Sequence, residues 1–257
     1  AATFAESWLW KALAVGTSLD IAVVRKIKAK SAPTLSHYWE QTLGLISCNG
    51  YQIKESQKQL SASALHGLPD LCSTTQFRFE IDADQLDPFI RPKAFRPRKR
   101  EVYRAPLVLI KESPGESRES GWALLSFNDV AYDQSFYGYS AAGAKDGEML
   151  VRYLQLFAHS AIWQHYALLT ATKIGSERRT IYKQVFDNCP LLPYDQLNAQ
   201  QQRRVATLSK QLLKEDRRVF THIDRFFASL YDLDRLDCEV IRDTLSVVPP
   251  YKAVRLR

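Results

Sequence analysis

The stretch FIRPKAFRPRKREVYRAPLVLIKES, residues 89–113, joins a dense group of cations to an apolar run. Its second half, APLVLIKE at 105–112, is continuously apolar up to its lysine, which is typical of a β-strand that is covered on both faces. We predict that it forms the central strand of a sheet. Because a buried strand has a fixed position, it would also fix where the preceding cations reach the surface.

Those cations hold almost all of the net charge of the protein. The chain carries +7, with 35 Lys and Arg against 28 Asp and Glu, and residues 91–104 alone carry +6. A charge concentrated in so short a segment favours a polyanionic partner such as nucleic acid. A solvated loop is the alternative that charge alone leaves open. The segment contains the cations Arg91, Lys93, Arg96, Arg98, Lys99, Arg100 and Arg104, and the single anion Glu101.

The composition is that of a globular protein with a substantial core. Of the 257 residues, 46% are hydrophobic and 25% are charged. No apolar run approaches the roughly 20 residues that a membrane-spanning helix needs. The start, AATFAESWLWKALAVG, has neither an initiator Met nor a basic signal-peptide region, so we expect a piece of a longer protein. Cys48, Cys72, Cys189 and Cys238 lie far apart with no neighbouring histidine, which favours reduced cysteines in a cytoplasmic protein.

Periodicity along the chain predicts an α+β fold, in which an antiparallel or mixed sheet is flanked by N-terminal and C-terminal helices. Much of 3–46 is expected to be helical, with Thr17 or Ser18 as an N-cap. Asn49-Gly50 is a turn signal between short strands. The remaining strands are predicted at 76–81, 105–112, 122–127 and 130–140, and the remaining helices at 148–173, 198–233 and 234–248, with a short helix or strand after residue 182.

No catalytic motif is complete. SVVPPY at 246–251 resembles the end of the motif with which adenine-N6 methyltransferases hold their target amino group, but Val248 cannot accept the required hydrogen bond, and two prolines that end a helix explain the stretch. No glycine-rich nucleotide loop is present. His159 and His165 are six residues apart, on opposite sides of a helix, so we expect packing or surface roles rather than a metal site.

A second candidate for binding lies in TKIGSERRTI at 172–181. There a predicted helix ends at a glycine, and Lys173, Ser176, Arg178 and Arg179 surround the turn. Such groups suit contacts with phosphates or base edges. A helix C-cap whose cations offset the helix dipole is the alternative. The aromatic residues Tyr132, Phe136, Tyr137 and Tyr139 can stack on bases, although the core of a strand explains them as well.

The order of several motifs resembles the C-terminal target-recognition region of large adenine-N6 DNA methyltransferases of restriction-modification or phage-defence systems. These include fused type IIG enzymes and relatives of type I specificity subunits. His159 stands where the family usually has Asn, and the methyl-donor loop and Asn-Pro-Pro-Tyr are missing and would precede residue 1. The matching residues are Pro106 to Lys111, Tyr139, Phe157 to Ser160, Gly175, Arg178, Arg179 and Pro190 to Pro193.

The resemblance implies a module that recognises double-stranded DNA for a catalytic methyltransferase domain in the same chain. It implies a helical junction at 1–72, a recognition domain at 73–195 and a helical segment at 196–257. S-adenosylmethionine is expected as the donor of the parent protein, and this chain is expected to hold no catalytic residue, cofactor or metal. The expected DNA contacts are Arg91, Lys93, Arg96, Arg98, Lys99, Arg100, Arg104, Lys111, Lys173, Ser176, Arg178 and Arg179.

Two other functions remain open at this point. The helical tail at 198–246 would suit a protein-interaction module that docks a partner subunit. A magnesium-dependent nuclease is the other alternative, although its carboxylates cannot be assembled from sequence spacing.

Overall fold

The computed structural model describes residues 6–30, 32–72, 77–113, 117–171, 180–216 and 218–247. Its centre is a four-stranded sheet in the order β1-β8-β5-β6, in which all neighbours are antiparallel. The strands are β1 (Ile46–Asn49), β8 (Phe136–Ser140), β5 (Leu107–Lys111) and β6 (Ala123–Ser126). All five residues of β5 are buried and the strand is interior, which confirms the prediction for 105–112.

Alternate residues of β5 face two different hydrophobic cores. Val108 and Ile110 belong to the larger core, which the helices complete, and α4 (Gly147–Ala158) packs directly on β5 and β6. Leu107 and Leu109 belong to a second core on the other face of the sheet. This division follows from the two-residue period of a strand, because successive side chains point to opposite faces. The continuous apolar run therefore reflects a strand with a core on each side.

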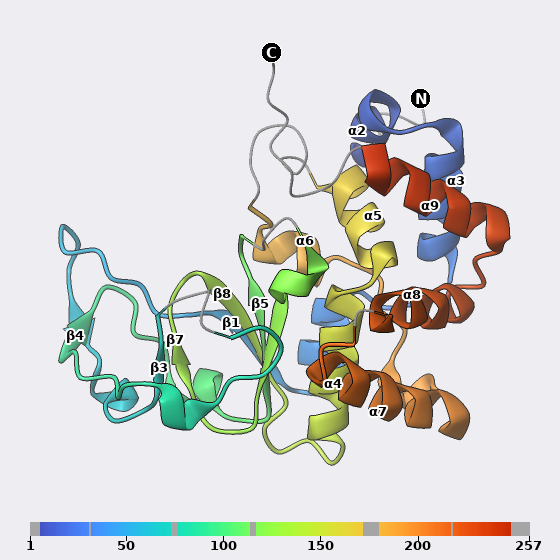
Figure 1. Cartoon of the computed structure of the whole chain (residues 1–257). Coiled ribbons are helices and arrows are strands. Elements are labelled where there is room, and N and C mark those ends of the chain that lie inside the picture. Colours follow the sequence, from blue (N-terminus) through green and yellow to red (C-terminus); the bar gives the residue numbers. More distant parts are fainter. Residues whose placement is uncertain are drawn as a thin grey trace.

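The second core holds together a small lobe with little regular structure, drawn at the left of Figure 1. In it β2 (Leu60–Ser61) pairs with β4 (Lys93–Ala94), and β3 (Asp70–Leu71) pairs in parallel with β7 (Ala131–Tyr132). Single 3₁₀ turns, at Ser63–Leu65, Ala83–Gln85 and Arg100–Tyr103, connect these strands. We call this part the strand lobe and the remainder the helical lobe.

The helical lobe packs around α5 (Ala161–Thr170), which contacts helices from both ends of the chain. Thr17 caps the second N-terminal helix through a capping box with Asp20, as predicted. The architecture is α+β, with helices at both ends of the described chain. The other helices are α2 (Trp8–Val15), α3 (Ser18–Ala29), the π-helix His37–Thr42, the 3₁₀ turns Arg118–Ser120 and Tyr194–Gln196, α6 (Lys183–Asp187), α7 (Ala199–Leu213), α8 (Val219–Leu230) and α9 (Arg235–Val247).

Two of the predicted helices were too long. The helix predicted at 148–173 is broken after Ala158, and Ser160 begins α5 by accepting a hydrogen bond from the Trp163 backbone N–H at 3.1 Å. The helix predicted at 198–233 is divided into α7 and α8, and Glu215 between them has a φ of 57°. In both places the apolar period continues across the break, so the pattern alone did not reveal it.

Three strand predictions also need correction. The segment 130–140 is two strands in different sheets, separated by a turn in which Asp133 accepts from the Ser135 backbone N–H at 2.8 Å. The described part of 76–81 makes only a single bridge, Glu80 to Leu125. Asn49-Gly50 is no hairpin turn. Gly50 instead lies so close to the backbone of the β7–β8 turn that an added Cβ would be 2.1 Å from the Asp133 carbonyl oxygen.

All four cysteines are free, as expected. None of the helices in the described ranges combines the length and the apolar character needed to cross a bilayer.

Candidate nucleic-acid interface

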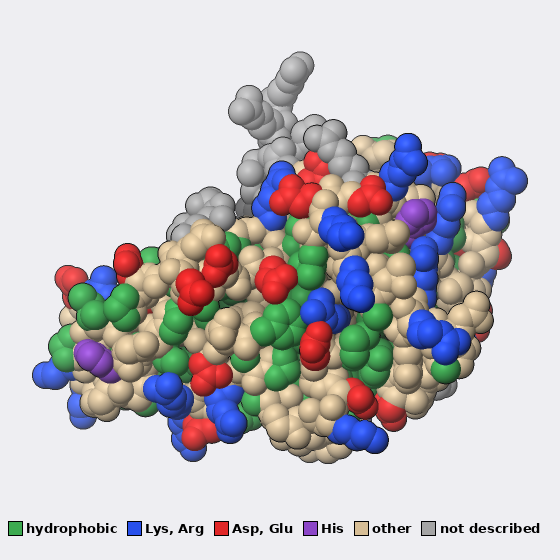
Figure 2. Space-filling view, turned by 60° about the horizontal axis from the view of Figure 1, so that its bottom comes forward, with side chains coloured by type: hydrophobic (Ala, Val, Ile, Leu, Met, Phe, Trp, Pro, Cys, Tyr) green, Lys and Arg blue, Asp and Glu red, His purple; other side chains and the backbone are tan. Residues whose placement is uncertain are grey.

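Residues 91–104, which we call the basic segment, run along the surface of the strand lobe and lead directly into β5. Six of its seven cations are exposed, and Arg98 is half-buried. Figure 2 shows Lys and Arg side chains at this end of the molecule and others at the opposite, helical end. The segment is long and has little regular structure, so other contacts must hold it in place.

Buried side chains and backbone hydrogen bonds supply those contacts. Tyr103 is fully buried, and its hydroxyl donates to the Pro97 carbonyl at 2.8 Å, which closes the segment into a loop. The Arg98 backbone has a φ of 65°, and its guanidinium donates to the Gly50 carbonyl at 3.4 Å. Arg100 donates to the Ala64 carbonyl at 3.2 Å. These bonds go to neutral carbonyl groups, so they orient the two arginines while their charge stays available.

No carboxylate of the described residues forms an ion pair with any cation of the basic segment. Cations held close together on a folded surface raise the local potential and attract an anion with a matching repeat of charge. The unpaired positive charge therefore favours binding of a polyanion over a structural role in ion pairs.

A bulge in the basic segment places an aromatic ring beside two of these cations. The backbone N–H groups of Phe95 and Arg96 both donate to the Gln52 carbonyl, and Gln52 N–H donates back to the Arg96 carbonyl. Two residues thus oppose one, which redirects their side chains. The Arg96 guanidinium lies 5.0 Å and the Lys54 amine 5.6 Å from the centre of the half-exposed Phe95 ring.

The basic segment also borders a shallow hollow of about 740 Å³. Its floor includes the half-exposed apolar side chains of Ile46 and Leu60, which are 41% and 49% exposed. An apolar floor with a cationic rim suits a ligand that combines flat groups with negative charge, as the bases and phosphates of a nucleic acid do. The lining residues are Ile46, Cys48, Leu60, Arg96, Pro97, Arg98, Lys99, Glu101 and Val102.

Lys111 does not join this surface. It is the last residue of β5, it is only 4% exposed, and its amine donates to the Ser120 carbonyl at 3.1 Å. Burial lowers its pKa to about 8. The prediction that Lys111 contacts DNA therefore conflicts with its position, because the strand that carries it is covered on both faces.

Lys173, Ser176, Arg178 and Arg179 lie outside the described residues. The next described residue, Thr180, lies near Ser113 at the C-terminal end of β5, with the two hydroxyl oxygens 3.3 Å apart. The basic segment joins the N-terminal end of the same strand.

The four aromatic residues proposed for base stacking are all buried, so that interpretation is wrong and their role in the core of the sheet holds. Two of their hydroxyl groups bond within the fold: Tyr137 donates to the Ile181 carbonyl and Tyr139 to the Asp187 carboxylate, each at 2.7 Å. His159 and His165 are fully buried too, as expected for packing roles. The half-exposed ring of Phe95 could not be predicted from the sequence, because a single aromatic residue among cations gives no periodic signal.

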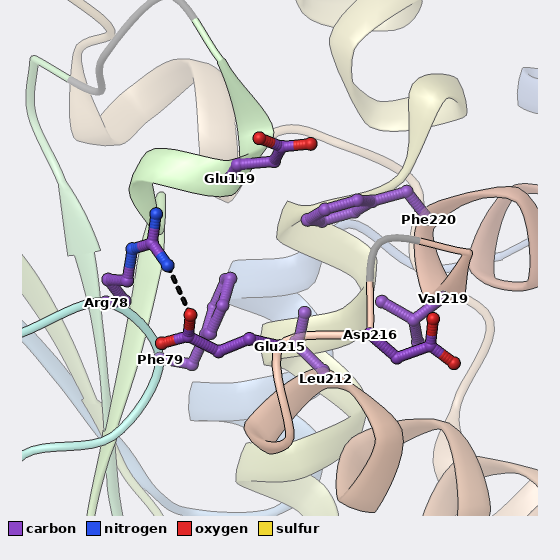
Figure 3. Close-up of a pocket in the computed structure, with 8 residues that line it drawn as sticks. All are labelled: Arg78, Phe79, Glu119, Leu212, Glu215, Asp216, Val219 and Phe220. Carbon is purple, nitrogen blue, oxygen red and sulfur yellow. Dashed lines mark hydrogen bonds and ion pairs between the residues drawn. The ribbon is translucent and has the colours of Figure 1, made fainter.

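A small pocket lies between the lobes, where Arg78 and Phe79 approach α7 and α8. Figure 3 shows Glu119, Glu215 and Asp216 around it, with Glu215 in an ion pair with Arg78. The cavity holds about 100 Å³, and Phe79 and Phe220 form much of its wall. No cluster of three metal-ligating side chains occurs within the described part of the chain. The described residues thus supply no carboxylate cluster for the nuclease alternative.

Fold and surface together define an α+β domain whose cationic segment, beside the sheet, forms no ion pair with a described carboxylate. No protein-family model matches the chain, and no curated protein matches its sequence. Among solved structures, the chain is similar to the type IIG restriction endonuclease BpuSI, with a TM-score of 0.53 and 9% identity. That similarity covers 95% of this chain and 34% of the endonuclease chain, so this chain spans about a third of it.

Two weaker similarities concern type I restriction-modification systems. A structure from a study of complex assembly in a type I system matches with a TM-score of 0.37, 16% identity, and coverage of 79% of this chain and 44% of the other. The HsdS subunit from Thermoanaerobacter tengcongensis matches with a TM-score of 0.35, 15% identity, and coverage of 93% and 53%. The fold is one that a type IIG restriction endonuclease contains, in agreement with the resemblance found in the sequence.

Proposed function

We propose that this chain is a sequence-recognition module that binds double-stranded DNA in a restriction-modification or phage-defence system. The observation that carries the proposal is the basic segment, which is anchored by buried residues and is free of ion pairs with the described carboxylates. The shared fold with part of a type IIG restriction endonuclease supports the same conclusion.

The basic segment would contact the phosphate backbone first. Duplex DNA presents one charge per about 1.7 Å of axis, and each cation that neutralises a phosphate releases a counterion. Arg96 and Arg98 flank the hollow described above, so they are the arginines that would reach base edges, where a guanidinium pairs with guanine in the major groove. In this division of roles, the remaining cations set position and these two read sequence.

The chemistry would belong to another part of the parent protein. We propose that this part is an adenine-N6 methyltransferase domain in the same chain, that it binds S-adenosylmethionine, and that it acts on an adenine turned out of the duplex. The sequence given has no glycine-rich nucleotide loop, so none of its residues is assigned to the donor. A DNA-processing role of this kind would place the protein in the cytoplasm.

Charge reversal tests the proposal. Changing Arg96, Arg98 and Arg100 to Glu should abolish binding to duplex DNA at about 50 mM salt, because three contacts become repulsive. A matched control changes Arg25, Lys145 and Arg242 to Glu, which alters the net charge equally at exposed positions away from the segment. Binding is measured by fluorescence anisotropy with a pool of random duplexes.

Equal loss of binding in both variants would show that only net charge matters and would contradict a defined interface. Unchanged binding in the triple Glu variant would contradict the proposal directly. If the chain instead docks a partner subunit through the helical tail at 198–246, the triple Glu variant should keep its affinity for that partner.

A further inference from the structure

A second cationic surface lies at the far end of the helical lobe, in a groove between α7 and α8. We call it the α7–α8 groove. It is an open hollow of about 630 Å³, and in Figure 1 these two helices lie at the end of the molecule opposite to β4. Figure 2 shows Lys and Arg side chains gathered at that end of the visible face. The lining residues are Gln200, Gln201, Arg203, Arg204, Thr207, His222, Arg225, Phe226 and Ser229.

Outside the basic segment, the arginines around this groove differ from the other described arginines because they form no ion pair with a described carboxylate. The described residues include fifteen arginines, and six of them form ion pairs: Arg25, Arg78, Arg118, Arg152, Arg235 and Arg242. The other nine form none with described carboxylates. Five of these lie in the basic segment, and the remaining four are Arg203, Arg204, Arg218 and Arg225, on or beside α7 and α8.

The acidic residues near the groove are already engaged elsewhere. Asp224 accepts from Arg118 at 2.7 Å and from the Ala161 backbone N–H at 2.7 Å, on the side of α8 that faces α5. Glu215 pairs with Arg78 at the small pocket between the lobes. No carboxylate is among the residues that line the α7–α8 groove. The charge of its three arginines is therefore not neutralised within the described fold.

The other lining groups are neutral hydrogen-bonding side chains rather than apolar ones. Gln200, Gln201, Thr207 and Ser229 provide amides and hydroxyls, and Phe226, only 7% exposed, is the one large apolar residue. His222 contributes a buried Nδ1 that has no hydrogen-bond partner among the described residues. Arginines combined with Gln, Ser and Thr are the side chains that contact phosphate and sugar oxygens in nucleic-acid complexes.

We propose that the α7–α8 groove binds the phosphate backbone of a nucleic acid, as a contact separate from the basic segment. The inference rests on the proposed function for the choice of DNA as the ligand. Three arginines with no carboxylate among the lining residues, together with Gln, Ser and Thr side chains, favour a phosphate backbone as the occupant.

The two surfaces would engage one duplex only if it is long enough or bent. A folded protein of this length has a radius of gyration of about 18 Å, so opposite sides of the molecule lie on the order of 45 Å apart. At about 3.4 Å per base pair this corresponds to roughly 13 base pairs. A duplex of about 10 base pairs can therefore occupy one surface, whereas one of about 30 base pairs can occupy both.

Neutralisation of the groove tests the inference. The variant Arg203→Gln, Arg204→Gln, Arg225→Gln removes the charge and keeps polar side chains. The control Arg25→Gln, Arg235→Gln, Arg242→Gln removes three arginines that form ion pairs at exposed sites. On a duplex of about 30 base pairs, the slope of log affinity against log salt should be less steep by about 3 for the groove variant than for the wild type. The fall in affinity between about 50 and about 200 mM salt should then shrink by roughly 60-fold.

Comparison with the Arg96, Arg98 and Arg100 variant separates this inference from the proposed function. If only the basic-segment variant loses affinity for the long duplex, the proposed function stands and the groove inference is overturned. If only the groove variant loses affinity, the groove binds DNA and the proposed role of the basic segment fails. If neither loses affinity, both are wrong. Both variants must keep the thermal unfolding temperature of the wild type to within a few degrees.

Discussion

His159 provides the sharpest test of the fold, because its surroundings accept only the neutral ring. Its Nε2 accepts a hydrogen bond from the Trp122 backbone N–H at 3.0 Å, and its Nδ1 lies 2.8 Å from the Gln155 carbonyl, to which it must donate. Both nitrogens are thereby committed. Protonation of Nε2 would place its N–H group against the Trp122 backbone N–H in a fully buried site, and neither could then accept the other's hydrogen.

The pKa of His159 follows from this arrangement. Burial, together with the nearby charges of Arg118 and Lys111, lowers the pKa from 6.5 to about 4, although the Gln155 hydrogen bond opposes the change. Because the unfolded chain binds a proton more readily than the folded one, stability is complete above about pH 6.5 and is lost as the pH falls towards 4. At about 1.4 kcal/mol per pKa unit, the free energy of unfolding should fall by about 3 kcal/mol.

Urea unfolding at several pH values, followed by tryptophan fluorescence, measures this loss. The variant His159→Gln offers an amide oxygen to the Trp122 N–H and cannot titrate. Its free energy of unfolding is expected to be lower than that of the wild type at pH 7.5 by about 1 kcal/mol, and the difference should vanish or reverse near pH 4.5. Parallel pH profiles for the two proteins would refute the reasoning, since they would show that His159 does not carry the proton linkage.

Three further substitutions test other parts of the structure. Asp20→Asn should lower the free energy of unfolding by about 3 kcal/mol in urea at neutral pH, because the buried Asp20 carboxylate pairs with His165 at 2.7 Å; a change below about 1 kcal/mol would argue against the pair. Although burial opposes its ionisation, hydrogen bonds from His165 and Thr residues hold the pKa of Asp20 well below its usual range, so this contribution is lost only below about pH 4. Gly50→Ala should cost about 3 kcal/mol or more, seen as a large fall in Tm, because the new Cβ would meet the Asp133 carbonyl; near-normal Tm would mean that the chains there lie further apart. Lys111→Met should stabilise the protein by about 1 kcal/mol at pH 7, leave DNA binding unchanged, and remove the rise in stability that the wild type shows between about pH 8 and about pH 10.5, since its folded pKa is depressed by burial; loss of DNA binding would restore Lys111 as a contact.

The centre of the fold was predictable because its signals are local and strong. The apolar run of β5 can be satisfied only by burial on both faces, whatever surrounds it. The break between α4 and α5 was missed for the opposite reason. Ser160 leaves the helical conformation, with φ −76° and ψ 147°, in a sequence that has no proline or glycine and whose apolar period continues. Only tertiary packing decides that its hydroxyl acts as a cap.

The two cationic surfaces also differ in how far the sequence could predict them. The basic segment was evident because its cations are adjacent in the sequence and outnumber the anions there. The α7–α8 groove was not, because Arg203 and Arg225 lie on different helices and Asp224 directly precedes Arg225. Their charge is unopposed only because Asp224 is engaged by Arg118, a residue more than 100 positions earlier in the chain. That pairing is a property of the fold.

The dependence of duplex-DNA affinity on salt tests the central claim most directly. If the basic segment grips the phosphate backbone through at least four of its cations, the slope of log affinity against log salt should be steeper than about −3.5 for the wild type. The Arg96, Arg98 and Arg100 variant should show no measurable binding at about 50 mM salt. An affinity that does not change with salt concentration, or no binding of the wild type to any duplex at low salt, would contradict the account.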